Sequence, residues 1–149
     1  MTITKKVYVL SASAGGYRVL FTAAQSIYRT FGIECRVSSL TKVPSLSGVY
    51  FPDLLRLLVL TQEPYEVCQE KVLIVNVRRL EHRKEEVFFS RLFKETAFIL
   101  GRSIGLEACD KPDCLMFQTE KLPDLDRKGI RLCDVCAIEK DKLLRSLIS

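Results

Sequence analysis

Apolar and polar residues follow one another along the first forty residues in blocks typical of strands and helices. Residues 7–11 form a short apolar run rich in β-branched and aromatic side chains, which predicts a buried strand. Residues 17–31 place apolar side chains three or four positions apart, which predicts a helix ending at Gly32. Residues 33–37 have the pattern of a second strand. The chain therefore opens with a β-α-β unit, whose two strands we expect to be parallel.

The middle of the chain has a less regular pattern. Residues 41–50 are rich in serine, proline and glycine and predict a loop. Residues 52–58 show helical spacing, with Pro52 acceptable in a first turn. Residues 57–60 and 71–78 are the next strand candidates, and the second of these contains the strongest strand pattern of the chain.

The last part of the chain returns to a helical pattern. Residues 83–103 carry a broad apolar face, which predicts a helix that stops at Gly105. The following segment reads as loop, with a C-terminal helix predicted near residues 138–147. The alternation of strands and helices predicts a mixed α/β layer.

Length and composition favour one domain. A chain of 149 residues with 48% hydrophobic content is long enough to bury a real core. No stretch approaches the roughly 20 apolar residues of a membrane-spanning helix, and residues 1–7 lack the apolar core of a signal peptide. We therefore expect a cytoplasmic protein without a membrane partner.

The net charge of +5 is unevenly distributed. Residues 1–108 hold 15 basic and 10 acidic side chains, whereas residues 109–149 hold 8 of each. A nucleic-acid-binding zinc module usually gathers its positive charge around the metal. The neutral cysteine-rich tail argues against nucleic acid as a partner, although the overall charge keeps a zinc-ribbon nucleic-acid binder as an alternative.

Four of the six cysteines have the spacing of a metal site. They form C-x4-C followed by C-x2-C and are Cys109, Cys114, Cys133 and Cys136. Zn²⁺ binds four thiolates tetrahedrally, and paired short spacings in a reducing compartment favour metal over disulfides. Four cysteine ligands leave no open position for water, so we expect one structural Zn²⁺ that cross-links residues 107–136. Four unconnected buried cysteines, or a redox pair at Cys133 and Cys136, remain the alternatives.

Four segments carry a resemblance to a known family. They are GLEAC at 105–109, CLM at 114–116, DRKG at 126–129 and CDVC at 133–136. Together they resemble the archaemetzincins, whose signature is H-E-x-x-H-x-x-G-x-x-H, then C-x4-C-x-M, then C-x2-C. The resemblance covers roughly residues 72–136. It implies a metzincin-like twisted, mixed β-sheet with backing and active-site helices, followed by a small four-cysteine zinc subdomain. We expect a single domain, 1–149, with an α/β part at 1–104 and a zinc-binding part at 105–149.

The chain departs from the family pattern at the residues that carry the chemistry. Four residues differ in register with the motif. Phe98 replaces the first histidine, Ile99 the glutamate, Arg102 the second histidine and Ala108 the third histidine. The motif works because helix positions i and i+4 both reach the metal, and because the glutamate takes a proton from metal-bound water. None of the four replacements can do either task. Gly105, which ends the helix, is kept, and Met116 corresponds to the Met-turn residue.

These departures predict a catalytically inactive archaemetzincin-like protein, with no catalytic zinc, that binds a protein or peptide in the remnant cleft. An active zinc peptidase with atypical ligands is the alternative. The segment 61–71 is short for the upper rim and edge strand that the resemblance implies for binding substrate.

Other routes to catalysis have little support in the sequence. The candidate carboxylates Glu95, Glu107, Asp110 and Asp126 show no pairing, and the lone cysteines Cys35 and Cys68 have only His82 as an imidazole partner. We expect His82 to face solvent.

The position of Arg102 allows two hypotheses. Its guanidinium either replaces the lost metal as a buried cation, bonded to Glu107, Asp126 or loop carbonyls, or lies on the surface.

Overall fold

The computed structural model describes residues 5–12, 16–40, 53–62 and 71–148. In these ranges the strands are β1 (Lys6–Ala12), β2 (Cys35–Leu40), β3 (Leu54–Thr61) and β4 (Val72–Asn76). The helices are α1 (Tyr17–Phe31), the short 3-10 helix η1 (Val77–Leu80), α2 (Glu85–Ile104), α3 (Leu122–Arg127) and α4 (Asp134–Ile148). The predicted loop at 41–50 and most of the segment 61–71 lie outside the described residues.

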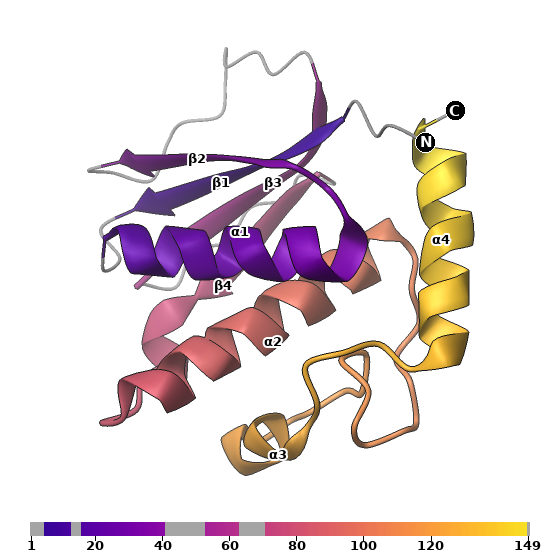
Figure 1. Ribbon diagram of the computed structural model, residues 1–149. Helices are drawn as coiled ribbons and strands as arrows, with labels where there is room; N and C mark the ends of the chain where they lie inside the picture. The colour runs from indigo at the N-terminus through magenta and orange to yellow at the C-terminus, as the bar shows by residue number, and fades with distance from the viewer. Residues whose placement is uncertain (1–4, 13–15, 41–52, 63–70, 149) are drawn as a thin grey trace.

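The four described strands form one parallel sheet in the order β2-β1-β3-β4 (Figure 1). The parallel pairing of β1 and β2 confirms the predicted β-α-β unit, and the α/β fold class is confirmed as well. We expected a mixed sheet, but every pair of strands in the described part of the chain is parallel.

Helices α1 and α2 pack together and cover one face of the sheet (Figure 1). The main core lies between them and the strands, and includes Val9, Leu20, Ile27, Leu58 and Leu92. A second apolar cluster on the opposite face is built around Leu10, Leu57 and Val59. The sheet is therefore apolar on both faces, as parallel sheets usually are.

The predicted helix over residues 52–58 is wrong, since β3 begins at Leu54. Burial on both faces of a strand gives a continuous apolar run, and Leu54, Leu55, Leu57 and Leu58 imitate helical spacing within it. Helix α4 also begins earlier than predicted, at Asp134, and α3 was not expected. None of the helices in the described part of the chain is long and apolar enough to cross a membrane.

Candidate functional site: the end of α2 and the cysteine cluster

Helix α2 ends in a tight turn at Gly105. This residue has φ of 112°, a left-handed conformation that favours glycine, and its N–H donates to the Arg102 carbonyl at 3.2 Å. The N–H of Leu106 donates to the Gly101 carbonyl at 2.9 Å. The turn directs the chain past Ala108, which is exposed, to the first cysteine of the cluster.

Phe98 lies half-buried on α2 and is covered by a lysine. The Lys128 Nζ is 4.6 Å from the centroid of the Phe98 ring and donates to the Phe117 carbonyl at 3.0 Å. Lys128 is only 3% exposed. Burial lowers the pKa of its ammonium to about 8, although the nearby Glu95 carboxylate acts in the opposite direction. An aromatic ring and a cation, neither of which can bind a metal ion, thus meet at the first position of the motif.

Arg102 lies at the surface. Its side chain is exposed, and its Nη1 donates to the Leu106 carbonyl at 3.1 Å. The hypothesis of a buried guanidinium in place of the metal is therefore wrong, because α2 turns this position, two residues before its last one, toward solvent. The hydrogen-bond partner of Arg102 is nevertheless a loop carbonyl, which was one of the partners considered for a buried guanidinium.

Asp126, one of the carboxylates considered for Arg102, binds Arg91 instead. The Arg91 Nε and Nη2 each donate to one Asp126 carboxylate oxygen at 2.8 Å. This bidentate pair holds the pKa of Asp126 below its usual range. The buried Lys94 adds bonds from its Nζ to the Leu125 and Asp126 carbonyls, at 3.1 and 3.0 Å. These contacts attach α3 to α2.

Met116 is fully buried beneath α2. A Cβ atom added at Gly101 would lie 2.6 Å from the Met116 Sδ, so glycine allows this close approach. The Met116 carbonyl accepts a hydrogen bond from the Cys109 N–H at 2.7 Å. Met116 therefore joins the end of α2 to the cysteine cluster by packing and by its backbone.

The structure brings the four cysteines of the spacing motif together. Their Sγ atoms all lie within 4.8 Å of one another, and those of Cys109 and Cys133 are 3.8 Å apart. A tetrahedral Zn²⁺ with Zn–S bonds near 2.3 Å separates its sulfurs by about 3.8 Å. The sulfur atoms are therefore placed closely enough to hold one ion of this kind.

Backbone amides point at the sulfur atoms. The N–H groups of Met116 and Cys133 donate to the Cys114 Sγ at 3.4 and 3.3 Å, and that of Lys111 to the Cys109 Sγ at 3.5 Å. Such donors stabilise negative charge on sulfur. The backbone N–H of Cys136 lowers the pKa of Cys133 to about 7, whereas burial raises that of Cys136. The donor set fits a thiolate-bound zinc ion, and it does not fit four unconnected cysteines.

The remaining candidates lie apart from one another. Glu95 pairs with Arg79 at 2.9 Å, Glu107 and Asp110 are exposed, and Cys68 lies outside the described residues. His82 is exposed and accepts a hydrogen bond from the Lys84 N–H at 3.0 Å. Among the described residues, the four cysteines are the only group of histidine, cysteine and acidic side chains placed to hold a metal ion.

Sequence reasoning missed the roles of two residues here. Lys128 stood in the DRKG segment, but nothing in the pattern said that it would face Phe98. The bidentate partner of Asp126 could have been sought among the arginines of α2, since Arg91 falls on its apolar face.

Comparison with known proteins supports the resemblance. Residues 36–142 match the model described as peptidase family M54. The archaemetzincin of Methanopyrus kandleri is 32% identical over 69 residues, which cover 46% of this chain and 39% of that protein. The aligned part thus spans well under two thirds of the relative.

Solved structures show the same fold over nearly the whole chain. The crystal structure of the Methanopyrus kandleri archaemetzincin matches with a TM-score of 0.78 and 21% identity, covering 95% of this chain and 97% of that one. A structure described as a zinc-dependent peptidase from Methanocorpusculum labreanum matches with a TM-score of 0.74 and 16% identity, covering 90% and 99%. The predicted archaemetzincin resemblance and metzincin-like fold are confirmed.

Proposed function

This chain belongs to peptidase family M54, and we propose that it is a member without peptidase activity that holds one structural zinc ion and binds a protein or peptide. The observation that carries the proposal is the set of side chains at the motif positions. Phe98 and Ala108 offer no lone pair to a metal, and Arg102 is a fixed cation. Ile99 cannot take a proton from water.

The packing around the motif supports the same proposal. A metal ion beside Phe98 would meet the ammonium of Lys128, 4.6 Å from the ring centroid, and like charges repel strongly where water is excluded. Lys128 is held there by its bond to the Phe117 carbonyl. A second metal site would therefore require both new ligands and the displacement of a buried lysine.

The four cysteines supply the zinc site of the proposal. When bound, the ion cross-links three segments: the turn after α2, the loop carrying Cys114 and the start of α4. Cys109 and Cys114 come from the first two segments, and Cys133 and Cys136 from the third. No ligand position remains for water, so the ion has a structural role.

A groove of about 630 Å³ beside Ala108 is the surface that we assign to the partner. It lies between residues 105–110 and α4, and Val135 on its wall is 66% exposed. The carboxylates of Glu107, Asp110 and Glu139 line it. This combination suits an extended segment that carries basic and apolar side chains.

The test of inactivity compares two proteins in one assay. The natural chain should not cleave a broad peptide library, with or without added zinc. The matched variant restores the motif with Phe98→His, Ile99→Glu, Arg102→His and Ala108→His, together with Lys128→Met to remove the ammonium. It should take up a second zinc ion. Turnover by the repurified natural chain that a chelator abolishes would overturn the proposal.

A further inference from the structure

One backbone edge of strand β2 pairs with no other described strand. This strand is the last of the sheet and pairs with β1 only, among the residues that the structure describes. The Val7 N–H donates to the Glu34 carbonyl at 3.1 Å, so the backbone groups of Glu34 face β1. Because these directions alternate along a strand, the N–H and C=O groups of Cys35 and Val37 face outward. Unpaired outward groups of this kind are a template for another strand.

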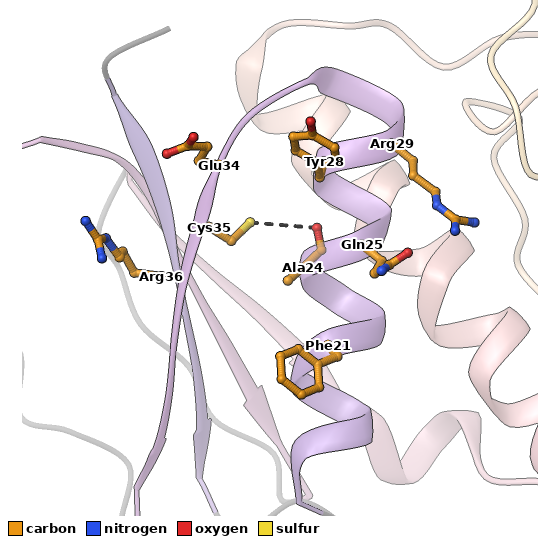
Figure 2. A pocket seen from close by; sticks show the side chains of 8 residues that line it. All are labelled: Phe21, Ala24, Gln25, Tyr28, Arg29, Glu34, Cys35 and Arg36. Atoms are coloured by element: carbon orange, nitrogen blue, oxygen red, sulfur yellow. Dashed lines mark hydrogen bonds between the residues drawn. The ribbon is translucent and has the colours of Figure 1, made fainter.

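A stripe of aromatic side chains on α1 borders this edge. Tyr17, Phe21 and Tyr28 are 69%, 54% and 62% exposed, and the rings of the first two stack with centroids 5.8 Å apart. Phe21, Tyr28 and Cys35 line a groove of about 620 Å³ between α1 and β2 (Figure 2). Large aromatic side chains gathered on one flank are typical of an interaction surface.

Two charged side chains at the start of the same strand, Glu34 and Arg36, also line this groove. Glu34 and Arg36 point away from α1, whereas Cys35 points toward Ala24 on that helix (Figure 2). Both charged residues are exposed, and neither forms a salt bridge with another described residue. Opposite charges two residues apart make this edge complementary to a second copy of itself.

We propose that β2 pairs antiparallel with β2 of a second copy of this chain, about a two-fold axis at Cys35. In this register Glu34 lies opposite the partner's Arg36, and the symmetry repeats the pair. A two-fold axis at Arg36 would place the Arg36 side chains of the two copies opposite each other. An axis at Val37 would place Arg36 opposite the partner's Ser38. All three registers place residues with outward-facing backbone groups opposite one another, so backbone hydrogen bonding does not distinguish them. The pairing of opposite charges selects the register with the axis at Cys35.

The helices agree with this arrangement. Helix α1 packs over both β1 and β2, and neighbouring strands lie about 4.8 Å apart. Two such helices across a β2–β2 junction would be separated by about 10 Å, which is a normal distance for packed helices. Phe21 and Tyr28 of each copy would then be covered by the partner's α1. The continuous sheet of the pair would have no open edge at β2.

Sedimentation equilibrium of the zinc-loaded full chain over a concentration series tests the proposal. The natural chain should form a dimer. Arg36→Glu and Glu34→Arg should each raise the dissociation constant about tenfold or more, because each creates two like-charge pairs. The double variant with both substitutions should return to the natural value, because it restores both pairs with reversed sign. Arg83→Glu, which changes an exposed arginine elsewhere, is the charge-matched control and should leave the dimer unchanged.

Circular dichroism verifies that each variant is folded, which these exposed positions should allow. A natural chain that stays monomeric throughout the series overturns the proposal. A dimer that tolerates the single substitutions, or a double variant that fails to recover, overturns the register about Cys35.

Discussion

At the residue scale, the buried ammonium of Lys128 makes stability depend on pH. Its pKa is about 8 in the folded chain and 10.5 in an unfolded one, so the unfolded chain holds the proton more firmly. Stability should therefore rise as the pH increases from about 8 to 10.5, by about 3 kcal/mol if the whole shift is expressed. Below pH 8 the cost of burying the charge is fully present.

The variant Lys128→Met isolates this effect, since it keeps the length of the side chain and removes the titrating group. The unfolding free energies of both proteins are measured in urea at pH 7.5, 9 and 10. As the pH rises, the value for the natural chain should increase relative to that for the variant. Zinc binding and the other titrating groups act in both proteins alike. Parallel pH profiles would mean that Lys128 keeps an ordinary pKa.

Gly129, the next residue, approaches the backbone of another loop. A Cβ atom there would lie 2.3 Å from the Asp113 carbonyl oxygen, which already accepts the Gly129 N–H at 3.1 Å. Gly129→Ala should therefore destabilise the chain by about 1–3 kcal/mol, since backbone must move. Ile130→Ala, at an exposed neighbour, is the control and should cost much less. Equal unfolding free energies for the two variants would contradict the close approach.

At the element scale, α3 is held to α2 by the Arg91–Asp126 pair. Arg91→Met should cost about 1.5–3 kcal/mol, because Arg91 is buried and its guanidinium makes two charged hydrogen bonds. Arg127→Met on α3 is the control: its exposed pair with Asp124 should contribute less than about 0.5 kcal/mol. Thermal unfolding of the two variants measures the difference, and equal melting temperatures would refute the role of Arg91.

Helices α1 and α2, each with one buried face, were predictable, whereas one of the strands buried on both faces was partly misread. α1 and α2 have clear apolar stripes, and α2 ends, as the pattern indicated, at Gly105. β3 was partly misread as helix because its apolar run carries no alternation. The six residues of α3 have too few turns for a periodic signal, and tertiary contacts from Arg91 and Lys94 hold it in place.

Part of the candidate site could also be predicted from the sequence, and part could not. The spacing of the cysteines was enough to predict the cluster, because short paired turns bring ligands together whatever the rest of the fold does. The surroundings of Phe98 were not predictable, since Lys128 reaches it from a segment 30 residues away in sequence. The sequence alone did not decide between the two hypotheses for Arg102, which the structure places at the surface.

At the scale of the whole molecule, the zinc site should stabilise the C-terminal part more than the sheet. Cys114→Ser should speed hydrogen exchange across residues 107–136, because α3 is the only helix that lies wholly within these residues and the metal ties their loops together. Exchange in β1 and β3 should change little, because the pairing of these strands and the cover from α1 and α2 (Figure 1) remain when the metal is lost. Cys35→Ser, at a cysteine outside the cluster, is the control. Uniform loosening of the sheet and the tail together would show that the two parts unfold as one.

The central proposal is that the chain has kept the structural zinc site and has lost the catalytic one. The number of zinc ions bound per chain tests this most directly. Inductively coupled plasma mass spectrometry on the protein purified without added metal should give one zinc per natural chain, one for Cys35→Ser and none for Cys114→Ser. Two zinc ions per natural chain, or one that persists in Cys114→Ser, would contradict it.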